Sequence, residues 1–179
     1  MYVLGVIVMA LLENILIQGP IFAFVLTLSL LAIMKGLSPR IWGFSDYPKE
    51  VTSIVPPQTQ QEKRIASILM VPFLIIGLGF PIASTLLLRA SQGGVISVID
   101  AFLNLFGLMM FGNIADLIIL DILIVGTITP TWVIIPGTEH LKESAYKEFR
   151  KMHAKGHVWG TLFMAFLSLI IGVVIGLFQ

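Results

Sequence analysis

The chain has 179 residues, of which 57% are hydrophobic and 12% are charged, with a formal net charge of +1 and no cysteine. Soluble domains contain about 45–50% apolar and about 25% charged residues, and a chain of this size cannot hide so much apolar surface in a soluble core. The composition therefore excludes a soluble enzyme, a disordered chain, a nucleic-acid-binding protein and any disulfide or cysteine-ligated metal centre, and it predicts a polytopic membrane protein.

Four apolar segments follow one another along the chain: residues 2–34, 65–88, 95–128 and 158–178. The second and fourth have roughly the 20 residues that cross a bilayer core as a helix. The first and third are longer than one perpendicular crossing requires, so they must tilt, protrude or break. The pattern predicts an all-α fold, an integral membrane four-helix bundle, with residues 1–179 forming a single transmembrane domain.

Basic residues define the predicted topology. Ten of the eleven lysines and arginines lie in two loops, residues 35–64 and 137–157. The positive-inside rule places both loops in the cytoplasm. Because two loops on one side are separated by an even number of crossings, residues 95–128 are predicted to form one long third helix. We therefore expect a multi-pass protein of a prokaryotic plasma membrane, with both termini outside the cytoplasm.

Local signals refine these helices. Gly19-Pro20 predicts a kink in the first helix, because proline removes a backbone donor and clashes with the preceding turn. The loop of residues 35–64 contains several prolines and is predicted to be extended until it turns helical near Gln60. Residues 140–157 contain no proline and many helix formers, which predicts a short amphipathic cytoplasmic helix before the fourth span.

Two stretches of the chain contain distinctive sequence motifs. The first contains Asp46-Tyr47-Pro48, Pro56-Pro57-Gln58-Thr59 and Glu62-Lys63-Arg64, and the second is Ile135-Pro136-Gly137-Thr138-Glu139. These segments resemble small prokaryotic polytopic membrane proteins of unassigned function. The resemblance implies a membrane location and no biochemical role.

Four acidic residues lie inside the predicted spans: Glu13, Asp100, Asp116 and Asp121. A carboxylate within a bilayer is costly and requires a partner, a proton or a cation. The topology places Glu13 and Asp100 near the outer boundary, beside Arg89 at the end of the second span. This predicts an outer ion-pair cluster with Asn104 as a hydrogen-bond partner, or alternatively a vestibule for a cation.

The inner end of the bundle collects all three histidines, His140, His153 and His157. His153 and His157 are four residues apart, so a continuous helix stacks them on one face. Two imidazoles and a carboxylate are suitable ligands for Zn²⁺ or a similar divalent ion, with Asp121 as the first candidate carboxylate and Glu139 as the second. The alternative interpretation is that these histidines face the headgroups of anionic lipids.

Asp116 and Asp121 are five residues apart, which places them about 140° apart around an α-helix. A straight α-helix cannot aim both carboxylates at one point. We therefore expect Asp116 to lie with Asn113 and to serve a different contact from Asp121.

Three functional classes are consistent with these patterns. The first is a carrier that binds or translocates a small cation or an ion-coupled solute through polar residues of the spans. Its candidate ligands are Glu13, Asp100, Asn104, Asp116 and Asp121. The second is a metal-dependent membrane enzyme that acts on a lipid-like substrate at the cytoplasmic leaflet, with Asp121 and His157 as catalytic residues and His153, Glu139 and His140 as further metal ligands. The third is an accessory subunit, either a homo-oligomer or part of a membrane complex, because Gly156/Gly160 and Gly172/Gly176 permit close helix approach.

Overall fold

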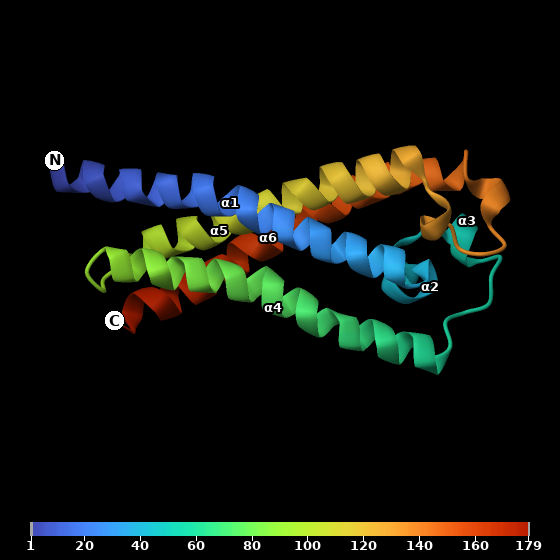
Figure 1. Ribbon diagram of the computed structural model, residues 1–179, viewed down its shortest axis with the longest axis horizontal. Helices are drawn as coiled ribbons and strands as arrows, with labels where there is room; N and C mark the ends of the chain where they lie inside the picture. Colours follow the sequence, from blue (N-terminus) through green and yellow to red (C-terminus); the bar gives the residue numbers. More distant parts are fainter. Residues whose placement is uncertain (1, 179) are drawn as a thin grey trace. The chain divides into compact units, whose positions relative to one another are not determined.

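The computed structural model describes the backbone of residues 2–178 and the side chains of residues 9–178. In this part of the chain every regular element is helical (Figure 1). The long elements are α1 (Tyr2–Gly36), α4 (Gln60–Ser91), α5 (Val98–Ala115), its continuation η2 (Asp116–Ile128) and α6 (Ala145–Leu177). Within the described residues, four helices are long and apolar enough to cross a membrane. The predicted all-α fold is confirmed, and the helices support the prediction of a polytopic membrane protein.

Short helical turns occupy the two polar loops. They are α2 (Pro39–Trp42), η1 (Phe44–Asp46), α3 (Lys49–Thr52), η3 (Thr131–Val133) and η4 (Glu139–Leu141). The first polar loop is thus more helical than its prolines predicted. It turns into α4 at Gln60, as expected, because Thr59 and Glu62 form a reciprocal capping box. The Thr59 amide donates to Glu62 Oε2 at 2.7 Å, and the Glu62 amide donates to Thr59 Oγ1 at 3.2 Å.

Two predicted features of the long helices can be compared with the structure. α1 continues through Gly19 and Pro20 without interruption, and a kink at this point stays a prediction. The amphipathic segment predicted as a separate short helix is instead the first part of α6, which runs unbroken from Ala145. Gly156 lies inside this helix, where one glycine costs only about 1 kcal/mol and does not end it.

The third long helix changes its winding along its length. Residues Val98–Ala115 are α-helical, whereas Asp116–Ile128 form a π-helix, in which backbone hydrogen bonds join residues five apart. The element ends at Thr129, whose left-handed backbone has φ = 47° and whose amide donates to the Ile124 carbonyl at 2.8 Å. The prediction of one long third helix is therefore confirmed, but its inner part has a different period from the α-helix that was expected.

The chain forms two compact units. The first comprises Met1–Leu26, Leu74–Ile114 and Trp159–Gln179, and the second comprises Thr27–Phe73 and Ala115–Val158. The first unit is a bundle of four helix segments, with a core that includes Leu11, Leu88, Leu105 and Ile175. Its helices approach closely at glycines. A Cβ atom on Gly172 of α6 would lie 3.0 Å from the backbone nitrogen of Phe102 in α5.

A closed network of neutral side chains joins three helices inside the first unit. Asn14 Nδ2 donates to Ser84 Oγ at 2.9 Å and to Asn104 Oδ1 at 2.8 Å. Asn104 is fully buried, and its Nδ2 donates to Thr85 Oγ1 at 2.9 Å. The Thr85 hydroxyl in turn donates to the Pro81 carbonyl at 2.8 Å. Hydrogen bonds of this kind hold apolar helices together where the hydrophobic effect cannot.

The second unit packs its short turns around buried aromatic residues. Tyr47, which follows η1, is 3% exposed and donates its hydroxyl to the Val133 carbonyl at 2.7 Å. Its ring contacts Tyr146 and Phe149 of α6, with ring centroids 5.6 and 5.5 Å away. Burial raises the pKa of Tyr47, so this phenol stays neutral. These contacts fix the backbone of Asp46 beside α6.

Candidate metal centre

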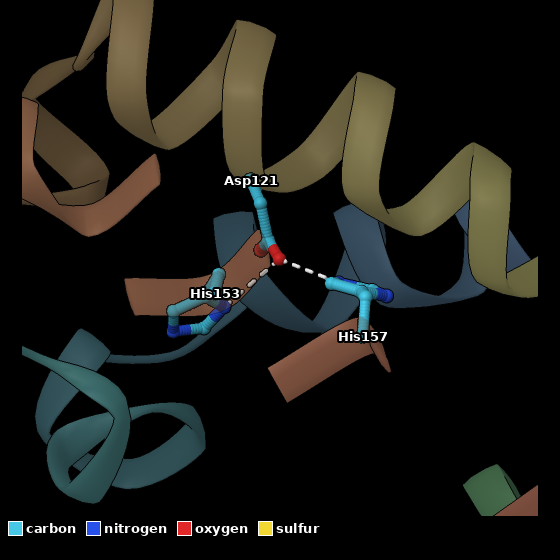
Figure 2. Close-up of side chains that lie close together, drawn as sticks. All are labelled: Asp121, His153 and His157. Atoms are coloured by element: carbon cyan, nitrogen blue, oxygen red, sulfur yellow. Dashed lines mark hydrogen bonds and ion pairs between the residues drawn. The ribbon is translucent and has the colours of Figure 1, made fainter. Parts of the chain in front are cut away.

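Three side chains of the second unit converge on one point. His153 Nδ1 and His157 Nε2 each lie 2.8 Å from the same atom, Asp121 Oδ2 (Figure 2). Asp121 projects from η2 and is 7% exposed, while both histidines project from α6. The predicted pairing of His153 with His157 on one helix face, with Asp121 as the first carboxylate, is what the structure contains.

The periodicity of α6 explains how the imidazoles are positioned. Phe149, His153 and His157 recur every four residues, so they follow one another along one face of the helix. The Phe149 ring stacks on the His153 ring with centroids 3.7 Å apart and an angle of 22° between the planes. Sequence reasoning missed this residue, although its spacing of four from His153 was a usable signal. The stacked phenyl ring restricts rotation of the His153 side chain.

The backbone carbonyl of Asp46 sets the tautomer of His153. His153 Nε2 lies 3.1 Å from this carbonyl oxygen, which can only accept, so Nε2 carries the proton. When the ring is neutral, Nδ1 then keeps its lone pair on the side of Asp121. A second ring nitrogen that donates to a backbone carbonyl is the usual way in which a protein orients a metal-binding histidine. No residue pattern predicts this contact, because it comes from a main-chain atom.

The donor set fits a divalent transition metal ion. One nitrogen of each histidine and one oxygen of Asp121 all lie within 4.8 Å of one another. Zn²⁺ binds such ligands at about 2.0–2.2 Å in a tetrahedron, which separates neighbouring ligand atoms by about 3.3 Å. The two nitrogens would therefore move about 0.5 Å away from Asp121 Oδ2 to admit an ion. Three protein ligands leave the fourth tetrahedral position open.

A cavity of about 530 Å³ in the second unit opens beside these ligands. Its wall includes the three ligand residues together with Asp46, Asp116 and Gln58. The rest is mainly aliphatic and aromatic residues of α1, α2, η1, α4, η2 and α6. Desolvation by the surrounding protein raises the pKa of the Asp46 carboxyl group, and positive charge on His153 opposes this shift. The candidate metal centre is thus one polar patch in a largely apolar chamber.

Asp116 lies outside the ligand triad, as expected, but it lines the same cavity as Asp121. The reason is the π-helix that begins at Asp116. A π-helix has about 4.4 residues per turn, so residues five apart lie about 50° apart rather than about 140°. The change of helix period brings both carboxylates to one wall.

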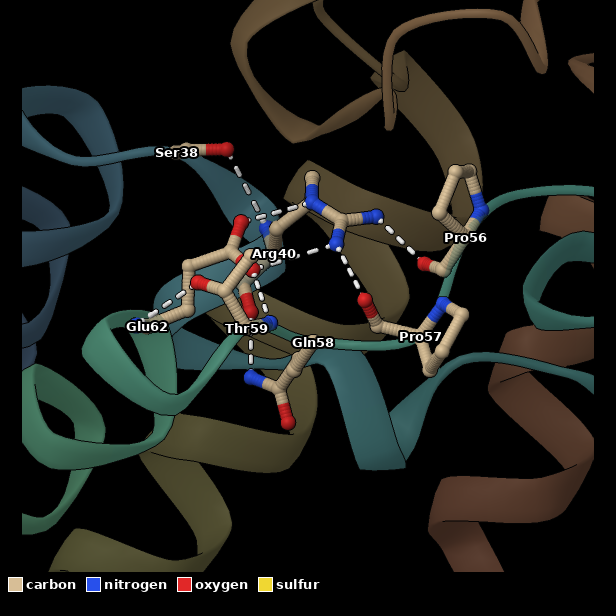
Figure 3. A network of polar contacts seen from close by, with 7 residues as sticks. All are labelled: Ser38, Arg40, Pro56, Pro57, Gln58, Thr59 and Glu62. Atoms are coloured by element: carbon tan, nitrogen blue, oxygen red, sulfur yellow. Dashed lines mark hydrogen bonds and ion pairs between the residues drawn. The ribbon is translucent and has the colours of Figure 1, made fainter.

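An arginine clasp holds another part of the cavity wall in place (Figure 3). Arg40 donates through Nε and Nη2 to the two carboxylate oxygens of Glu62, at 2.7 and 3.1 Å. Its remaining donors reach the carbonyls of Pro56 and Pro57 at 2.9 and 3.1 Å. The hydrogen bond with Glu62 raises the pKa of the Arg40 guanidinium, which stays charged. Gln58, whose side chain lines the cavity, donates to the Arg40 carbonyl.

Two further residues predicted as metal ligands, Glu139 and His140, are not part of the cluster formed by the described side chains. Glu139 is exposed and its Oε1 accepts a hydrogen bond from the Gly137 amide at 3.1 Å. Backbone amides of Glu139 and Gly137 lower the pKa of this carboxylate. His140 is exposed beside it. Both residues lie in the turn η4, which is stabilised by contacts of its own backbone.

The predicted outer ion-pair cluster is wrong for the described side chains. Arg89 donates to the carbonyls of Gly94 and Phe178, at 2.7 and 3.3 Å, and forms no ion pair there with Glu13 or Asp100. Glu13 is exposed. Asp100 accepts from Ser97 Oγ at 2.7 Å, and its amide donates to the same hydroxyl oxygen at 3.0 Å. The S-x-x-D spacing is a helix-capping signal, so Asp100 has a structural role at the start of α5.

Asn104, also predicted as an ion ligand, belongs to the neutral network of the first unit.

Comparison with known proteins adds no identity: no family model, no curated protein and no solved structure matches the chain. The function must therefore be inferred from the candidate metal centre and its cavity.

Proposed function

We propose that the protein is a membrane-embedded, metal-dependent enzyme that acts on an amphipathic, lipid-like substrate. Asp121, His153 and His157 would hold a divalent ion such as Zn²⁺, and the adjoining cavity would hold the substrate. The observation that carries the proposal is the convergence of two imidazole nitrogens on one carboxylate oxygen, 2.8 Å from each, in the wall of that cavity.

The number of ligands favours catalysis over a purely structural metal. Structural zinc sites are closed by four protein ligands, whereas catalytic sites use three and leave one position for water or substrate. When bound, the ion would supply a Lewis acid that polarises a substrate oxygen. In this proposal the catalytic roles predicted for Asp121 and His157 are those of metal ligands, and the Asp46 carbonyl orients His153.

The cavity supports an amphipathic substrate. Its volume of about 530 Å³ lies within the range of about 300–1,000 Å³ that is usual for small-molecule sites. Its aliphatic wall comes from helices that are apolar enough to span a membrane. A cation carrier is less well supported, because Asp100 caps α5 and Asn104 is committed to a neutral network. The accessory-subunit hypothesis does not explain why the three ligand residues converge.

Metal analysis of the purified full-length protein tests the proposal. We expect about one equivalent of a transition metal per chain after dialysis, and Co²⁺ substitution should give the intense visible absorption of a tetrahedral site. His157→Ala should lose the metal, while His140→Ala, a matched histidine outside the cluster, should keep it. A wild-type protein that binds Zn²⁺ no better than His157→Ala would contradict the proposal. Zn²⁺ accumulation by proteoliposomes would favour the carrier instead.

We also propose that the enzyme lies in a prokaryotic plasma membrane with both basic loops, and hence the metal centre, on the cytoplasmic side. The positive-inside rule supports this orientation, and both loops belong to the unit that contains the three ligands. Thr59→Cys and Ser144→Cys should be protected from an impermeant thiol reagent in intact cells. Labelling of Ser144→Cys alone would place the two loops on opposite sides and refute this topology.

A further inference from the structure

The cavity beside the metal centre has an unbalanced charge. Among the described residues that line it are three acidic ones, Asp46, Asp116 and Asp121, and neither a lysine nor an arginine. Arg40, which lies close in sequence to this wall, is paired with the Glu62 carboxylate, which balances its positive charge. The basic groups of the wall are the imidazoles of His153 and His157.

The excess of negative charge persists whether or not a metal is bound. A divalent ion with neutral imidazoles places two positive charges against three acidic residues. Without an ion, only the two imidazoles face the three acidic residues. Charge interactions are several-fold stronger in a chamber with apolar walls than in water. An anionic headgroup such as a phosphate monoester is therefore disfavoured, whereas a cationic headgroup would balance the charge.

Aromatic rings in the wall favour the same kind of headgroup. Trp42, Phe44, Phe73 and Phe149 all line the cavity. Faces of such rings attract alkylammonium ions within about 6 Å, and sites for quaternary ammonium groups are commonly built from several of them. Phe44 already has a cation nearby, because the guanidinium carbon of Arg40 lies 5.1 Å from its ring centroid. Aliphatic side chains such as Leu30 and Met70 supply the surface for an apolar tail.

We propose that the cavity selects an amphiphile with an organic ammonium headgroup, which Asp46 and Asp116 bind by charge and the aromatic residues by their ring faces. This inference deepens the proposed function by giving the substrate class of the same cavity, and it rests on that function for the role of the metal. Asp116 is the residue that distinguishes this selection from metal binding, because it lines the cavity without belonging to the ligand triad.

Calorimetric titration of the full chain in uncharged micelles tests this selection. The probes are octyltrimethylammonium, octyl phosphate and octyl glucoside, which share one tail and differ in headgroup charge. We expect the ammonium probe to bind at least about tenfold more tightly than the phosphate probe. Asp116→Asn should reduce that preference to less than about threefold, and Asp46→Asn should act in the same direction. Glu50→Gln removes an exposed carboxylate of the same unit outside the cavity wall and should leave the preference unchanged.

Each result separates this inference from the metal proposal. Equal binding of the three probes by the wild type, or tighter binding of octyl phosphate, overturns the selection even if one metal ion is found per chain. A preference that Asp116→Asn and Glu50→Gln reduce equally also overturns it, because it would then reflect net charge and not this cavity. A preserved preference in a protein that binds no metal supports the ammonium site and contradicts the metal-dependent enzyme.

Discussion

The two units of the chain use polar side chains in opposite ways. In the first unit Asn14, Ser84, Asn104 and Thr85 are neutral, and they satisfy one another in a closed network. In the second unit ionisable residues, namely Asp46, Asp116, Asp121, His153 and His157, line one cavity. Neutral hydrogen bonds hold apolar helices together at small cost. Ionisable groups among apolar helices are expensive, and they are expected where a protein carries out its function.

The third long helix changes character in the same way. Its part in the first unit is a regular α-helix, closely approached by a glycine of α6. Its part in the second unit is a π-helix that carries Asp116 and Asp121. π-Helical segments are rare and are frequently found at functional sites. The first unit is therefore built for packing, and the irregular second unit is where we expect the chemistry to take place.

Removal of a metal ligand should have the largest effect. Even changes to residues that only orient a ligand cost about 10–100-fold in metal affinity, so loss of a ligand in Asp121→Asn or His153→Ala should cost more than about 100-fold. Zn²⁺ affinity measured by competition with a chromophoric chelator checks this expectation. The matched variants Glu139→Gln and His140→Ala should stay within about twofold of the wild type. If these controls lose affinity to the same extent, the comparison between a functional cluster and its surroundings fails.

Lower pH should weaken metal binding in the second unit. A metal requires neutral imidazoles, and protons compete with the metal for them as the pH falls. Affinity for Zn²⁺ should therefore fall by about 10- to 100-fold between pH 7.5 and pH 5.5. The first unit contains no histidine among its described residues, so its packing should be insensitive over this range. Affinity that is constant with pH would indicate that the imidazoles are not ligands.

Much of the fold followed from the sequence, because apolar length and helix signals act locally. Four apolar segments predicted four long helices, and the start of α4 near Gln60 followed from polar residues that cap a helix. The prediction of a separate amphipathic helix before the fourth span was wrong. Its polar face suggested a boundary near Val158, but no residue there breaks a helix, so α6 begins at Ala145.

The site could be predicted only as far as α-helical periodicity applied. His153 and His157 share a face because α6 is regular. Asp121, the carboxylate predicted first as their partner, contacts both of them. The presence of Asp116 in the same cavity as Asp121 was not predicted, because the switch to a π-helix leaves no clear mark in the sequence. Arg89 was misplaced for another reason. The charge pattern suggested carboxylate partners, but nearby backbone carbonyls satisfy its guanidinium.

Close packing in the first unit should be sensitive to a single methyl group. A Cβ on Gly172 would lie 3.0 and 3.2 Å from the backbone nitrogen and Cα of Phe102, atoms that cannot move aside alone. Overpacking of this kind costs about 1–3 kcal/mol, so Gly172→Ala should lower the free energy of unfolding in mixed micelles by that amount. Gly77→Ala is the matched control, because nothing lies within 4 Å of its added Cβ. An equal loss in both variants would mean that helix contact is not the cause.

The smallest effect should come from Asn104, and it tests whether the neutral network is structural. Asn104→Ala removes the acceptor for Asn14 and the donor to Thr85. Hydrogen bonds between membrane helices average about 0.6 kcal/mol, so the loss should be about 1 kcal/mol. A double-mutant cycle with Asn14→Ala should show coupling of similar size, because the two residues share one bond. Zn²⁺ affinity and octyltrimethylammonium binding should not change, since Asn104 lies in the other unit from the triad. Had Asn104 been an ion ligand, as its position among span acids suggested, its removal would alter cation binding and leave stability nearly unchanged. That result would break the division between a packing unit and a functional unit.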